Sequence, residues 1–203
     1  SISRVLHAIL LVFALAFASQ GSAQTARETI AAAALEKSVA KKRQLIDSLA
    51  GEGDPAIVTL LDAWRQDRLF ILTAASGERV VVQLDGEPDE QSRYSIRLVS
   101  TGEPLLDENN SAVRANPSEL APVDHNALLR RSMKGVLDLV DLGSDDAATR
   151  LRAVQTIGYS QDAAKLAPLQ KRLEEETDDR VREALQEGVA LIRLKEASAE
   201  TRI

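Results

Sequence analysis

Apolar positions follow helical spacing over most of this chain and give way to short strand-like runs only in its middle third. The spacing predicts one helix over residues 25–50, ended by Gly51. A second helix is expected to begin at Asp54-Pro55, because Asp accepts from unpaired amides at a helix start and Pro lacks the amide that would be unpaired there. The buried stripe of this second helix is expected to comprise Ile57, Val58, Leu60, Leu61 and Trp64. Residues 24–67 therefore form a predicted helical pair.

The period changes after Arg68. Three β-branched or apolar runs, Leu69–Leu72, Val80–Val82 and Tyr94–Leu98, are separated by Gly-containing turns. They predict a small β-meander inserted over residues 68–106, which is too small to be stable without packing on the helices. Residues 107–123 are rich in Asn, Ser and Pro and are interpreted as a linker.

Helical spacing returns at about Asp124 and continues until Gly143. Two acidic clusters, Ser144-Asp145-Asp146 and Thr177-Asp178-Asp179, are expected to cap the following helices, since carboxylates at a first turn complement the positive end of the helix dipole. The last of these helices is predicted to run to about Lys195.

A similar pattern occurs twice in this part of the chain. Leu151-Arg152-Ala153 leads to Gly158, and Val181-Arg182-Glu183-Ala184 leads to Gly188, at an offset of 30 positions. This rhythm is typical of HEAT-like repeats, which stack and present an extended surface to another macromolecule. The fold class is therefore predicted to be mainly α, with HEAT-like repeats over residues 124–203. Arg152 and Arg182 are candidates either for bridging stacked units or for binding a partner.

The N-terminal residues are typical of a secretory signal. Arg4 precedes the apolar run from Val5 to Phe17, and Gly21-Ser22-Ala23 follows. We expect residues 1–23 to be a signal peptide cleaved after Ala23; the alternative is an uncleaved anchor, for which the apolar run is short. Export implies an oxidising compartment, but the chain has zero cysteines. Its stability is therefore expected to come from packing and not from disulfides.

Composition disfavours several classes of function. A net charge of −6 with few clustered cations argues against nucleic-acid binding. No catalytic, metal or cofactor-binding residues are predicted, and the protein is not expected to be an enzyme. His125 is interpreted as structural; the alternative pairs it with Asp124 or Asp138 as acid/base groups. The acidic run from Asp85 to Glu90 lacks the ligand spacing of a calcium loop.

The order of these parts resembles a known family. Asp54-Pro55, Arg68-Leu69-Phe70, Gly77-Glu78-Arg79-Val80-Val81, Thr101-Gly102-Glu103-Pro104-Leu105 and His125-Asn126 precede the HEAT-like repeats. This is similar to the N-terminal extracytoplasmic region of the urea ABC transporter permease of the branched-chain amino-acid permease type. The resemblance covers nearly the whole chain.

The resemblance implies a non-catalytic domain on the periplasmic side of the bacterial inner membrane. Its expected partners are ABC transporter subunits or the periplasmic substrate-binding protein, and its membrane association would come through a permease domain absent from this chain. No urea-contacting residue can be carried over. Two other hypotheses remain: a free periplasmic HEAT-repeat scaffold for protein–protein interaction, and, far behind, a hydrolase or metal enzyme.

Overall fold

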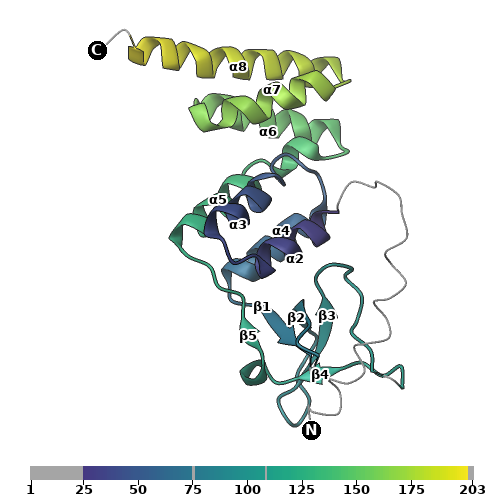
Figure 1. Cartoon of the computed structure of the whole chain (residues 1–203). Helices are drawn as coiled ribbons and strands as arrows, with labels where there is room; N and C mark the ends of the chain where they lie inside the picture. Colours follow the sequence, from purple (N-terminus) through teal and green to yellow (C-terminus); the bar gives the residue numbers. More distant parts are fainter. Residues whose placement is uncertain (1–24, 75, 108, 201–203) are drawn as a thin grey trace. The chain divides into compact units, whose positions relative to one another are not determined.

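The computed structural model describes residues 25–74, 76–107 and 109–200, with side chains to residue 198. The signal peptide expected over residues 1–23 lies outside these ranges. The described chain is mixed α/β, with α-helices and a five-stranded antiparallel sheet (Figure 1). It divides into unit 1, residues 1–48 and 56–133, and unit 2, residues 49–55 and 134–203. The division falls within helix α5, Ala127–Leu137.

The N-terminal segment of unit 1 forms two helices, α2 (Ala26–Leu35) and α3 (Val39–Asp47). The single helix expected over residues 25–50 is therefore wrong. Glu36 ends α2 in an extended conformation, and the Ser38 hydroxyl accepts from the Lys41 amide to begin α3. A side chain that bonds its own neighbouring backbone competes with helix continuation, which accounts for the break.

Helix α4, Pro55–Arg65, buries one face within unit 1. Ile57, Leu61 and Trp64 are at most 1% exposed. Val58, expected to be buried, is 38% exposed. Successive helical residues are rotated by about 100°, so Val58 points away from the stripe that its neighbours at helical spacing form. Elsewhere in unit 1, the Ser132 hydroxyl of α5 donates a hydrogen bond to the carboxylate of Asp47, the last residue of α3.

The sheet of unit 1 is larger than the expected meander. The three expected strands are present as β1 (Leu69–Thr73), β2 (Arg79–Asp85) and β3 (Tyr94–Leu98). Residues 107–123, interpreted as a linker, supply two further strands, β4 (Arg114–Ala115) and β5 (Ala121–Pro122). The order is β4-β3-β2-β1-β5, and the sheet curls into a half-barrel. Strands of two residues are too short to show an alternating pattern in sequence.

The edge strand β4 is fixed by the side chain of Arg114. Its guanidinium donates to the carbonyl oxygens of Arg93 and Glu87 and to the Ser95 hydroxyl, at 2.9, 3.1 and 3.3 Å. One face of the sheet has its own apolar core, formed by Phe70, Val82, Ile96, Val113, Ala115 and Leu120. The hydrogen bonds of Arg114 and the burial of these apolar side chains together stabilise this edge of the half-barrel.

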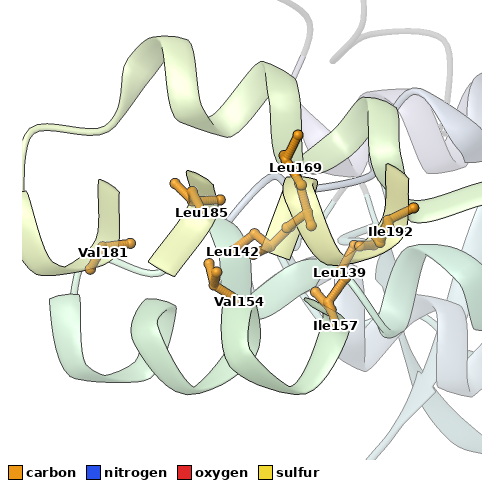
Figure 2. Packing of buried hydrophobic residues seen from close by; sticks show 9 residues of the cluster. Leu139, Leu142, Val154, Ile157, Leu169, Val181, Leu185 and Ile192 are labelled. Carbon is orange, nitrogen blue, oxygen red and sulfur yellow. The ribbon is translucent and has the colours of Figure 1, made fainter. Parts of the chain in front are cut away.

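Unit 2 is helical throughout its ordered elements. They are the 3₁₀ turn η4 (Val140–Gly143), α6 (Ala147–Ser160), the 3₁₀ turn η5 (Ala163–Lys165), α7 (Leu166–Glu175) and α8 (Asp179–Glu200). Their apolar side chains meet in one cluster, formed by Leu139, Leu142, Val154, Ile157, Leu169, Val181, Leu185, Val189 and Ile192 (Figure 2). Figure 2 shows the labelled side chains gathered together, with Leu139 and Leu142 from the segment around η4 and the others from α6, α7 and α8.

Two close backbone approaches in unit 2 depend on glycine. Helices α6 and α8 cross at Gly158 and Gly188, where a Cβ on Gly158 would lie 2.8 Å from the Gly188 Cα. Near η4, a Cβ on Gly53 would lie 1.9 Å from the carbonyl oxygen of Gly143. Only a residue without Cβ allows backbones this close. Within the described ranges, no helix is both long and apolar enough to cross a membrane.

Candidate partner-binding surface

Helices α6 and α8 of unit 2 begin with the same kind of cap. The Asp146 carboxylate accepts from the Thr149 amide at 2.8 Å, and the Asp178 carboxylate accepts from the Val181 amide at 3.1 Å. Both acidic clusters thus cap the helices they were expected to cap. Each carboxylate satisfies an amide that has no partner within its helix and faces the positive end of the helix dipole.

An arginine follows each of these caps and donates back to the chain before its helix. Arg182 Nη2 donates to the carbonyl oxygen of Glu176 at 2.8 Å, and Arg150 Nη1 donates to that of Ser144 at 2.8 Å. In both cases the acceptor lies six residues earlier. Arg150 is therefore the local counterpart of Arg182, at an offset of 32 positions instead of the 30 that the sequence pattern indicates.

Arg152 has different surroundings. Its side chain is exposed, and its Nη2 donates to the Thr149 hydroxyl of its own helix at 3.0 Å. Arg182 is also exposed, but its guanidinium donates to the Glu176 carbonyl in the corner between α7 and α8. The two arginines therefore do not make equivalent contacts. The hydrogen bond of Arg182 reaches the chain just before α8, whereas that of Arg152 stays within α6.

The charged centre of unit 2 is Glu176, immediately after α7. This residue is 1% exposed, and its carboxylate receives two guanidinium groups. Arg150 bonds both oxygens at 2.8 Å, and Arg172 donates to Oε2 at 3.0 and 3.1 Å. The amides of Thr177 and Asp178 donate to Oε1 at 3.0 and 2.9 Å. Every lone-pair direction of this buried carboxylate is thereby used.

This arrangement explains the acidity of Glu176. The hydrogen bonds from Arg150, with those from the Asp178 amide and Arg172, outweigh burial and lower the pKa of Glu176 to about 2. The same bond from Glu176 raises the pKa of Arg150. Both groups are therefore charged throughout the physiological range, and the network is a fixed structural device and not a proton donor or acceptor.

Arg150 and Glu176 were not among the candidates from sequence. Aligning the two helices by their capping aspartates, Asp146 and Asp178, would have paired Arg150 with Arg182 and drawn attention to it. Glu176 gives no such signal, because it is the last residue of an acidic triplet that is typical of an exposed helix end. Its burial depends on where the chain turns after α7.

The acid/base alternative for His125 is not supported by its neighbours. The His125 ring contacts Asp67 and Arg130, and neither Asp124 nor Asp138 bonds it. Asp138 instead binds Lys134 and Lys165. Although partial burial acts to raise the pKa of Asp138, the hydrogen bond from Lys134 and the charge of Lys165 lower it. Both ring nitrogens of His125 have partners, as expected for a structural histidine.

Among the residues that the structure describes, no three His, Asp or Glu side chains stand close enough together to hold a metal ion. The outer helix faces of unit 2 carry exposed side chains, including Arg152, Tyr159 and Leu194. The residues Tyr159 and Leu194 are 70% and 67% exposed.

Compared with known proteins, this chain matches no family model, no curated protein and no solved structure.

Proposed function

We propose that this chain is a non-catalytic extracytoplasmic module of, or associated with, the permease of an ABC-type urea importer, where it contacts partner subunits or the substrate-binding protein. The proposal rests on the resemblance in the order of parts and on the local repetition within unit 2. At the start of both α6 and α8, an aspartate caps the helix and an arginine donates to a carbonyl six residues earlier.

That repetition is the observation that carries a HEAT-like interpretation of unit 2. Stacked helix pairs need a reproducible corner so that each helix is placed on the previous one, and Arg150 and Arg182 supply it twice. At Gly158 and Gly188 the backbones of α6 and α8 approach closely. A framework of this kind uses its charged groups internally and offers its outer helix faces to a partner.

Within this proposal, Arg152 and Arg182 have separate roles. The hydrogen bond of Arg152 lies within its own helix and the residue is exposed, which suits its guanidinium to bind a carboxylate of a partner. Arg182 has one nitrogen committed to the Glu176 carbonyl. We assign Arg152 mainly to partner contact and Arg182 to both structure and contact.

The first test is the size and compartment of the native product, measured by fractionating source cells and probing with an antibody against residues 126–195. A large inner-membrane band and loss of urea uptake on deletion support the permease module. A small periplasmic band overturns it and supports the second candidate, a free scaffold. The observation that favours this candidate is the apolar cluster of unit 2, whose buried members all come from that unit.

A second test places a photo-crosslinker at Arg152 in cells. The expected adduct contains a transporter subunit or a substrate-binding protein. The matched control places it at Lys195, an exposed cation of α8. Equal adducts from both positions would contradict a specific role for Arg152.

A further inference from the structure

A small pocket opens beside α7 within unit 2. Its volume is about 280 Å³, just below the roughly 300–1,000 Å³ of pockets that hold whole small molecules. Three apolar and three charged residues line it: Ala50, Leu142, Pro168, Lys171, Arg172 and Glu175. A pocket of this size and lining is suited to a single amphipathic side chain.

The lining residues of α7 lie on one side of that helix. Pro168, Lys171, Arg172 and Glu175 follow the spacing i, i+3, i+4 and i+7, which places them on one helix face. Opposite them lies Leu142 of η4, which is 1% exposed and belongs to the apolar cluster of unit 2. This wall of the pocket is therefore fixed by core packing.

Arg172 is held in place by the buried carboxylate of Glu176. Its Nε and Nη2 donate to Oε2 of Glu176 at 3.1 and 3.0 Å, and its side chain is 21% exposed. Within the described residues its Nη1 donates to no acceptor, although every guanidinium nitrogen carries a donor. Because two of the three nitrogens are fixed, the third is a preorganised donor, which lowers the entropic cost of binding an acceptor.

Lys171 is a second cation of the pocket. It is exposed, and in the part of the chain that the structure describes its ammonium forms no ion pair, although Glu175 lies one helical turn away. The charged lining thus comprises two cations and one carboxylate. Lys171 and Arg172 both have donors left for an acceptor that enters the pocket.

We propose that this pocket receives an acidic side chain of a protein partner: the carboxylate bonds Lys171 Nζ and Arg172 Nη1, and its methylene stem lies against Leu142 and Pro168. Glu175 opposes the incoming charge and weakens the binding. The inference rests on the proposed function only for the identity of the partner. It adds a pocket on α7 to the exposed guanidinium of Arg152 on α6.

The first test is titration of the ¹⁵N-labelled full chain with N-acetylglutamic acid α-amide, followed by amide ¹H–¹⁵N shifts. The matched ligand is the glutamine analogue, which has nearly the same shape and no charge. We expect saturable shifts at Gly51, Leu142 and Lys171 with a dissociation constant of about 1 mM, as the efficiency of small ligands implies. Equal binding of the two ligands, or no saturable shift at these amides, would overturn the proposal.

Two variants test the charges separately. Lys171→Met keeps the stem and should weaken binding of the acidic probe by about threefold or more, whereas Glu175→Gln should strengthen it by a similar factor. The matched controls, Lys195→Met and Glu174→Gln, remove exposed charges that do not line the pocket. Thermal denaturation checks that each variant is folded. Equal effects of Lys171→Met and Lys195→Met would mean that only net charge acts and would contradict the pocket.

A photo-crosslinker at Lys171 in cells tests the partner. The expected adduct contains a transporter subunit or a substrate-binding protein. An adduct with a protein outside the transporter would keep the pocket and count against the proposed function. Failure of the probe to bind, together with a transporter adduct from Arg152, would do the reverse. No adduct from Lys171 would overturn the docking of a partner here.

Discussion

Arg150 and Glu176 form a two-point ion pair inside unit 2, with Nε to Oε2 and Nη2 to Oε1 distances of 2.8 Å each. They are 26 positions apart, so the pair fixes the corner after α7 against the beginning of α6. A buried ion pair gains little net stability over apolar packing, but loss of one partner leaves a buried charge unpaired. Its contribution here is therefore to define how the helices are placed.

The first prediction concerns removal of the Glu176 charge. Glu176→Gln preserves the shape but directs an amide N–H₂ at guanidinium donors, so we expect the free energy of unfolding to fall by about 3 kcal/mol. Chemical denaturation measures it. Glu175→Gln, an exposed neighbour on α7, should change it by less than about 0.5 kcal/mol. Equal effects of the two variants would show that the network does not stabilise unit 2.

The second prediction is acid sensitivity. The pKa of Glu176 falls from its ordinary 4.5 to about 2 in the folded protein. A lowered carboxyl pKa contributes stability that is present above pH 4.5 and lost as pH falls towards 2. The loss should be on the order of 3 kcal/mol across this window. Glu176→Gln should flatten the profile there; an unchanged profile would contradict the assignment.

The third prediction uses three helical glycines. Gly158→Ala places a Cβ 2.8 Å from the Gly188 backbone, whereas Gly188→Ala meets Gly158 at 3.4 Å. We expect the first to destabilise unit 2 by about 1–3 kcal/mol and the second by less. Gly135→Ala meets nothing within 4 Å and should stabilise by roughly 0.5–1 kcal/mol. Thermal denaturation of the three variants gives the order, and a reversed order would exclude a close crossing.

The fourth prediction separates the two arginines singled out from sequence. Arg182→Ala loses the bond to the Glu176 carbonyl and should cost about 1 kcal/mol of unfolding free energy. Arg152→Ala loses an exposed hydrogen bond to Thr149 and the charge near Asp146, and it should cost less than about 0.5 kcal/mol. Denaturation of each variant measures these costs. A larger cost for Arg152→Ala would reverse the roles proposed here.

The fifth prediction concerns Lys42 in unit 1, which is 7% exposed and whose ammonium lies 5.5 Å from the Trp64 ring centroid. Burial lowers the pKa of Lys42, against the attraction of Asp124 and Glu36. The protonated form is thus disfavoured on folding, and stability should rise as pH increases through the folded pKa. Lys42→Met keeps the buried stem and should raise the unfolding free energy by up to about 1 kcal/mol at neutral pH.

The control for Lys42→Met is Lys41→Met, because Lys41 is the exposed neighbour on α3. It should change the unfolding free energy by less than about 0.5 kcal/mol. A clear loss of stability in Lys42→Met would mean that the contact with Trp64 outweighs desolvation of the ammonium.

Local signals predicted the elements that depend on local interactions. Asp146 and Asp178 cap α6 and α8 because a carboxylate three residues before a free amide suffices for the bond. The stripe of Ile57, Leu61 and Trp64 is buried because helical spacing alone places these side chains on one face. By contrast, β4 and β5 are defined by pairing with distant strands, and their two residues carry no period.

The sequence by itself determined the helical period, the caps and the positions of β1, β2 and β3, since each follows from contacts within a few residues. Only the tertiary structure decided that Arg150 pairs with Glu176, that His125 faces Asp67, and that Gly158 crosses Gly188. These pairs are 26, 58 and 30 positions apart. Which charged residue is buried depends on how the helices pack, because the packing decides where a desolvated carboxylate finds its donors.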